Sequence, residues 1–110
     1  MGNTDKKEQG FTRVPNELYD AVLSQRLTAT QERALLYIIR KTCGFQKRED
    51  KISISKMARE TGFSRRAMIN AVHDLTKMGI IKCGTVTSGT PTYMTINHPS
   101  YWDRDPFRTV

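Results

Sequence analysis

Several features that define other classes of protein are missing from this sequence. Only two of its 110 residues are cysteines, Cys43 and Cys83, and they form no C-x-x-C pair, which is typical of a reduced, cytosolic chain. No run approaches the roughly eighteen apolar residues of a membrane-spanning helix, and the polar residues after Met1 are unlike a secretory signal. The length fits one compact domain and excludes a large catalytic core.

Motifs for nucleotide binding and hydrolysis are also missing. The chain contains no G-x-x-x-x-G-K-[ST], G-x-G-x-x-G, G-x-S-x-G or H-E-x-x-H pattern. Its histidines, His73 and His98, have spacings to the two cysteines that match no zinc-ligand pattern. Asp74 follows His73, but neighbouring helix residues point in different directions and do not form a catalytic dyad. We therefore expect no enzyme activity, no metal and no cofactor.

What the sequence does have is an excess of positive charge, confined to one segment. The chain carries 18 Lys and Arg against 11 Asp and Glu, a net charge of +7. Residues 1–39 carry five basic and five acidic side chains, and residues 83–110 carry two of each. Eleven basic residues lie between Arg40 and Lys82, against Glu49, Asp50, Glu60 and Asp74. A basic segment inside a folded domain indicates a polyanionic partner.

Apolar spacing predicts two helices in the N-terminal half. The first should begin near Pro15 and end near Gln25, with Leu18, Ala21 and Val22 on one face. Thr28 and Gln31 have the spacing of a capping box, in which each side chain satisfies a free backbone N–H at a helix start. In the helix that follows, which we expect Gly44 to end, the buried side should consist of Leu35, Ile38, Ile39 and Thr42.

Two further helices are predicted on either side of a three-residue turn. Residues 52–54 are expected to form a short strand, and Ser55 is expected to cap a helix over 56–61. The turn, residues 62–64, leads to a longer helix that Gly79 closes. The apolar stripe of this longer helix consists of Met68, Ala71, Val72, Leu75 and Met78.

After Gly79 the apolar period changes to two, which predicts a β-hairpin over residues 80–84 and 92–97. Helix, helix, short strand, helix, helix and hairpin is the order of a winged helix-turn-helix, a single, mainly α domain with a small β-hairpin. We assign this domain to residues 11–97 and a mobile arm to residues 1–10. Residues 98–110 could pack on the domain, contact a partner or act as a linker.

The exposed side of the longer helix presents groups that read base edges. Arginine spans guanine O6 and N7, asparagine pairs with adenine, and an apolar side chain contacts the thymine methyl. The first turn of such a helix usually enters the major groove. A solvated basic face is the alternative, but the turn, the hairpin and the confined charge favour base reading by Ser64, Arg65, Arg66, Ile69, Asn70 and His73.

Other residues could contact phosphates without reading sequence. We expect this of about half of Lys41, Lys47, Arg48, Lys51, Lys56, Arg59 and Lys77. The hairpin tip could act as a DNA-contacting wing through hydroxyl and amide groups, although a plain turn is an alternative because the tip has no Lys or Arg. The tip residues are Thr87, Ser88, Gly89 and Thr90.

Several blocks of the chain resemble the N-terminal domain of the phage replication protein O family. They are Phe11–Leu18, Leu27–Thr28, Leu35–Phe45, Asp50–Ser55, Glu60–Ser64 and Leu75–Lys82. The resemblance covers about residues 10–97 and is most specific in the run I-R-K-T-x-G-F. It implies a winged-helix domain whose residues 64–77 read repeated sites in the replication origin of a phage or mobile element, as a homodimer on each inverted repeat. Replication proteins would bind through a C-terminal region to which nothing here corresponds.

Two other functions fit the same pattern. The domain could instead repress transcription of an adjacent operon, because the fold alone does not separate the two tasks. It could also be a protein assembly module with Tyr101, Trp102 and Phe107 as anchors, although the confined positive charge argues against this.

Overall fold

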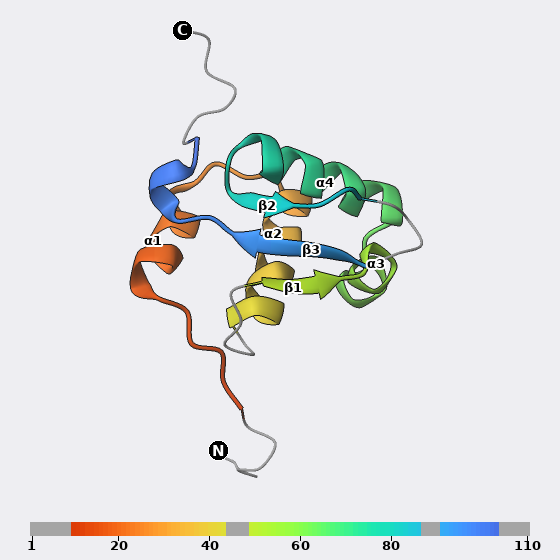
Figure 1. The fold of residues 1–110 in the computed structure, drawn as a ribbon, viewed down its shortest axis with the longest axis horizontal. Helices are drawn as coiled ribbons and strands as arrows, with labels where there is room; N and C mark the ends of the chain where they lie inside the picture. The colour runs from red at the N-terminus through yellow and green to blue at the C-terminus, as the bar shows by residue number, and fades with distance from the viewer. Residues whose placement is uncertain (1–9, 44–48, 87–90, 104–110) are drawn as a thin grey trace, which may run out of the picture.

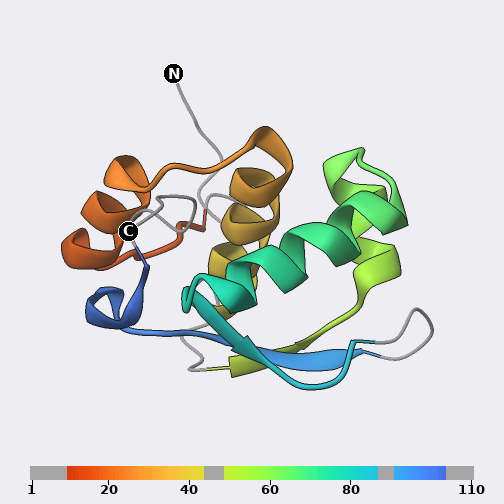
Figure 2. The same ribbon diagram turned by 90° about the horizontal axis from the view of Figure 1, so that it is seen from above.

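The structure, a computed structural model, describes residues 10–43, 49–86 and 91–103. Within these ranges four α-helices and a three-stranded antiparallel sheet form a mainly helical domain (Figure 1). Viewed from above, the sheet lies along one side of the helices (Figure 2). No helix in the described ranges has the length and apolar character needed to cross a membrane. The core lies between the sheet and helices α2, α3 and α4.

Helices α1 (Asn16–Ser24) and α2 (Ala29–Thr42) follow the predicted apolar spacing. The capping box is confirmed: Thr28 Oγ1 accepts from the Gln31 amide at 3.2 Å, and Gln31 Oε1 accepts from the Thr28 amide at 3.0 Å. The four side chains predicted for the inner side of α2 are all buried. Gly44, the predicted end of this helix, lies outside the described residues.

Helices α3 (Ile54–Thr61) and α4 (Arg65–Lys77) are joined by the predicted turn. Gly62 ends α3 with φ 82°, a left-handed conformation that glycine adopts without strain. Ser64 begins α4, because its hydroxyl oxygen accepts from the Ala67 amide at 3.0 Å. The predicted stripe of α4 is buried throughout.

The start of α3 differs from the prediction. Ser53, not Ser55, is the cap, and its Oγ accepts from the Lys56 amide at 3.2 Å. Ile54 is therefore the first residue of the helix rather than the last of a strand. The reason is packing, since the Ile54 side chain is only 1% exposed and joins the core when the helix begins there.

Strand β1 (Glu49–Ile52) lies at one edge of the sheet, β2 (Ile81–Cys83) at the other, and β3 (Thr92–Ile96) between them. The pairing of β2 with β3 confirms the predicted hairpin strands. The predicted strand over residues 52–54 lies too late in the chain: β1 ends at Ile52, with Lys51 paired to Tyr93 and Ile52 to Thr92. Hydrogen bonding to a strand far along the chain creates β1, whose own residues lack an apolar alternation.

The segment after β3 packs back on the domain. A 3-10 turn, Pro99–Tyr101, leads to Trp102, which is 6% exposed and donates from Nε1 to the Asn97 carbonyl at 2.9 Å. The Asp103 amide donates to the Met78 carbonyl at 2.7 Å, so the segment is bonded to the end of α4. Trp102 is therefore a core residue and not an exposed anchor for a partner. Phe107 lies outside the described residues.

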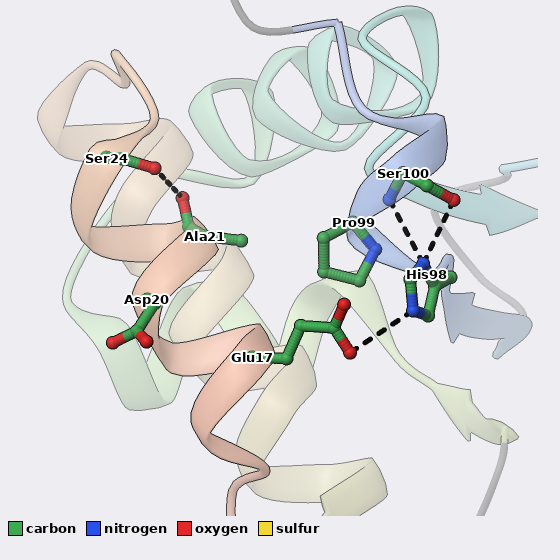
Figure 3. Close-up of a pocket in the computed structure, with 7 residues that line it drawn as sticks. All are labelled: Glu17, Asp20, Ala21, Ser24, His98, Pro99 and Ser100. Carbon is green, nitrogen blue, oxygen red and sulfur yellow. Dashed lines mark hydrogen bonds and ion pairs between the residues drawn. The ribbon is translucent and has the colours of Figure 1, made fainter.

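The same segment also contacts α1 (Figure 3). His98 Nε2 lies 3.2 Å from Glu17 Oε1, and the Gln25 side chain donates to the Asp103 carbonyl at 2.7 Å. Gly79, with φ 75°, makes room for the segment, because a Cβ there would lie 2.5 Å from the Tyr101 carbonyl oxygen. Residues 98–103 thus bridge α1 and the C-terminal end of α4.

Candidate nucleic-acid interface

The outward side of α4 gathers the residues predicted to read bases. We call this side the reading face; it consists of Arg65, Arg66, Ile69, Asn70 and His73. Ile69 is half-buried and the other four are exposed. At 3.6 residues per turn the five lie within an arc of about 140°. Ser64 precedes them and is exposed, but its hydroxyl is engaged in capping the helix.

The turn before α4 is held by several short-range contacts. Thr61 Oγ1 donates to the Met57 carbonyl at 2.7 Å and lies 3.7 Å from Met68 Sδ. The Arg33 guanidinium of α2 lies 5.6 Å from the centre of the Phe63 ring. Because α4 also packs on both α2 and α3, its outward side has a defined direction.

The single carboxylate of α4 is directed away from the reading face. Asp74 Oδ2 accepts from Gln31 Nε2 at 3.0 Å, so it is held toward the start of α2. Gln31 therefore has two roles, one in the capping box and one in holding Asp74. The reading face consequently presents guanidinium, amide, imidazole and apolar groups with no carboxylate among them.

A groove of about 490 Å³ joins α4 to the hairpin. It brings together His73, from the predicted reading set, and Lys77, from the predicted phosphate set. Sequence reasoning missed Thr76, which lies one helical turn beyond His73 and donates from Oγ1 to the Val72 carbonyl at 2.8 Å. The remaining lining residues come from the end of β2 and the connection after it: Cys83, Gly84, Thr85 and Val86.

The predicted phosphate-contacting residues fall into separate places. Arg59 is exposed on α3, and Lys77 is exposed at the end of α4. Lys41, Lys51 and Lys56 line a different cavity, of about 200 Å³, at the β1 edge of the sheet. Lys47, Arg48 and the predicted wing residues 87–90 lie outside the described residues.

Tyr37 lies in this second cavity and was not predicted as a site residue. The Lys41 Nζ lies 5.3 Å from the centre of its ring, a contact that the i, i+4 spacing on α2 could have indicated. Burial raises the pKa of the Tyr37 phenol to about 12, aided by the charge of Glu60 and the hydrogen bond to it. Tyr37 is therefore uncharged near neutral pH.

No group of three His, Cys, Asp or Glu side chains within the described ranges is arranged to hold a metal ion. Cys43 and Cys83 are unpaired half-buried thiols that pack against the core.

Comparison of the sequence with known proteins identifies its family. The family model for Bacteriophage replication protein O matches residues 3–97. The chain belongs to this family. The resemblance of the sequence blocks is thereby confirmed, and the chain is a member of a family of phage replication proteins.

Two curated relatives give the extent of the similarity. The chain is 32% identical over 74 residues to the DNA replication protein gp18 of Salmonella phage P22, covering 67% of this chain and 27% of that protein. It is 34% identical over 80 residues to Replication protein O of Escherichia phage lambda, covering 73% of this chain and 24% of that protein. The chain thus matches about a quarter of the length of these relatives.

Proposed function

We propose that residues 11–97 form a winged helix-turn-helix that binds double-stranded DNA sequence-specifically, as the origin-binding part of a phage replication initiator. The observation that carries the proposal is the reading face of α4. The element order supports it, because a helix, a short strand, two helices joined by a tight turn and a hairpin follow one another along the chain. The sheet order, β1-β3-β2, places the hairpin beside α4.

In this proposal α4 lies in the major groove. The groove is about 12 Å wide and admits one helix, so the five side chains of the reading face would meet base edges along its floor. Arg65 and Arg66, in the first turn, suit guanine, and Asn70 suits adenine. Lys77 is about 18 Å from Arg65 along the helix axis and would meet a phosphate rather than a base.

Replication is favoured over transcriptional repression because both relatives are replication proteins. Binding at an origin also fits a domain that matches one part of longer proteins, since recruiting other replication proteins would fall to the rest of such a chain. The confined positive charge of residues 40–82 fits the polyanionic partner.

We also propose that the domain binds inverted repeats as a homodimer. Apolar side chains on the outside of α1 and α2 offer a surface for self-association: Tyr19, Leu23 and Leu36 surround a cavity of about 240 Å³. Leu23 is 70% exposed. An apolar side chain that is exposed next to other apolar side chains is typical of an interaction surface. Sedimentation of wild type and Leu23→Asp with a duplex carrying one inverted repeat tests this. Two chains per duplex for wild type and one for the variant are expected.

Footprinting tests the main proposal. The protein would be incubated with DNA of its own gene and flanks at two salt concentrations, with Arg65→Ala as the comparison. The proposal expects protection of repeated sites within or beside the gene, weakened by salt and less selective for those sites in the variant. Protection over a promoter alone would favour the repressor, and uniform protection would contradict sequence reading.

A further inference from the structure

The β1 edge of the sheet carries lysines and tyrosines that base reading by α4 does not use. We call Lys41, Lys51, Lys56, Tyr37 and Tyr93 the lysine–tyrosine surface. The three lysines and Tyr37 line one cavity of about 200 Å³. Lys51 connects this cavity to Tyr93, because its Nζ also lies 5.3 Å from the centre of the Tyr93 ring.

Tyr93 is displayed on the solvent side of the middle strand. It is 55% exposed, whereas its neighbours Thr92 and Met94 are 6% and 1% exposed, as strand alternation requires. Lys51 on β1 pairs with Tyr93. Lys82 on β2 pairs with Thr95, which is two residues from Tyr93 and therefore on the same side of β3. The ring therefore stands on an open sheet face, with a lysine on each neighbouring strand.

The charge at the cavity is positive. The lining includes three lysines and one carboxylate, Asp50, whose Oδ1 accepts from the Lys51 backbone amide at 2.9 Å. The carboxylate of Glu60 accepts a hydrogen bond from the Tyr37 hydroxyl beside the cavity. Tyr37 itself adds no negative charge near neutral pH. The three lysines, Asp50 and the neighbouring Glu60 together carry a net charge of +1, which favours an anion such as a phosphate diester.

We propose that the lysine–tyrosine surface binds single-stranded DNA, with a base stacked on Tyr93 and the adjoining phosphates held by Lys41, Lys51 and Lys56. Exposed aromatic rings beside a positively charged groove are the combination that unpaired strands require, since only an unpaired base can leave its neighbours to stack on a protein ring. A duplex keeps its bases stacked inside, so it would have no use for Tyr93. The cavity is below the usual size of a pocket that encloses a whole small molecule, but it is large enough for a phosphate group.

The position of this surface leaves α4 available for a duplex. One cavity is lined by residues of α4 and β2 and the other by residues of β1. Strands β2 and β1 are the two edges of the sheet, on either side of β3 (Figure 1). The two cavities share no lining residue. One domain could then hold a duplex site and an adjoining unpaired strand at the same time, which suits a protein that acts where a duplex opens.

The test measures binding of a labelled oligothymidylate of about twelve nucleotides by fluorescence anisotropy, a length within the usual range for such sites. Thymidylate is chosen because it forms no duplex with itself. Tyr93→Ala should weaken binding roughly tenfold, since stacking on one ring typically contributes a factor of this order. Tyr93→Phe, which keeps the ring, should bind like wild type. Tyr101→Ala is the matched control, because Tyr101 is also exposed, at 74%, but lies on the 3-10 turn Pro99–Tyr101.

Salt dependence tests the lysines separately. Lys51→Gln and Lys56→Gln should each reduce the slope of log affinity against log salt by about 0.7 if each holds one phosphate of a single strand. In an iododeoxyuridine-substituted oligonucleotide, ultraviolet crosslinking should label Tyr93. Circular dichroism of each variant would confirm that the fold is retained.

The outcomes separate this proposal from base reading by α4. Arg65→Ala should leave oligothymidylate binding unchanged while duplex selectivity falls. The proposal is overturned if oligothymidylate does not bind, if Tyr93→Ala binds as well as Tyr101→Ala, or if a crosslink forms elsewhere. It is also overturned if the lysine variants weaken duplex binding instead, because the β1 edge would then belong to the duplex surface.

Discussion

The two edges of the sheet carry different chemistry on one framework. Beside α4 and β2, the reading face presents guanidinium, amide and imidazole groups, and its single nearby carboxylate is held away by Gln31. Beside β1, the lysine–tyrosine surface presents ammonium groups and aromatic rings. Planar hydrogen-bonding groups suit base edges in a groove, whereas rings and point charges suit unpaired bases and phosphates. The difference fits the two proposed ways of contacting DNA.

Both surfaces depend on the same core, and substitution of Trp102 tests this. Trp102→Ala should lower the free energy of unfolding by about 3–5 kcal/mol, because it removes a buried aromatic side chain at the end of α4. Both DNA-binding activities should then be lost together as the protein unfolds. Urea denaturation followed by circular dichroism measures the change. Tyr101→Ala is the control, and a change within about 0.5 kcal/mol is expected there because that side chain is 74% exposed.

Two basic residues of α4 test whether base reading and phosphate neutralisation belong to different side chains. Arg65→Ala should reduce discrimination between a selected duplex and an unrelated one by about 1–3 kcal/mol. Lys77→Ala should weaken binding to both duplexes equally and reduce the salt slope by about 0.9. Titrations at several salt concentrations measure both effects. Equal behaviour of the two variants would remove the distinction.

Gln31 offers a smaller test of the electrostatics of the reading face. Gln31→Ala should lower the free energy of unfolding by about 1 kcal/mol through loss of the capping box and should release Asp74. Released, the Asp74 carboxylate should weaken duplex binding by repelling phosphates. Thr28→Ala removes the other hydrogen bond of the capping box, from the Gln31 amide to Thr28 Oγ1, but keeps the Gln31 to Asp74 hydrogen bond. It should therefore lose stability without losing duplex affinity. Identical duplex affinities for the two variants would contradict the role given to Gln31.

Tyr37 tests whether the β1 edge is free of phenolate charge, and its effect should be the smallest. The folded protein raises the pKa of this phenol from 10.0 to about 12, so it holds the proton more tightly than the unfolded chain does. The resulting stabilisation is complete below about pH 10 and should be lost as the pH rises toward about 12. Tyr37→Phe should show a shallower fall in unfolding free energy across this range. A parallel fall in both proteins would count against the raised pKa.

Much of the helical part of the fold could be predicted from local signals. The capping residues Thr28 and Ser64, the glycine at position 62 and the apolar stripes act within one or two helical turns, and the structure has all of them. The start of α3 could not be predicted, because Ser53 and Ser55 flank Ile54 equally and only burial of Ile54 decides between them. Strand β1 depends on pairing with β3, which a local pattern does not contain.

The candidate site also has one part that local spacing predicts and another part that depends on distant contacts. The residues of the reading face follow from helical spacing alone, so their common side could be predicted. The separation of Lys41, Lys51 and Lys56 from α4 could not, since it depends on where β1 joins the sheet. The burial of Trp102 likewise depends on the distant contacts of Asn97 and Asp103 with residues 78–80.

The most direct test of sequence reading by α4 is selection of bound duplexes from a random pool with wild type and with Asn70→Ala. The account predicts a preferred site for wild type that contains an adenine whose preference disappears in Asn70→Ala, while the other positions keep theirs. An unchanged site in the variant, or no preferred site for the wild-type protein, would contradict it.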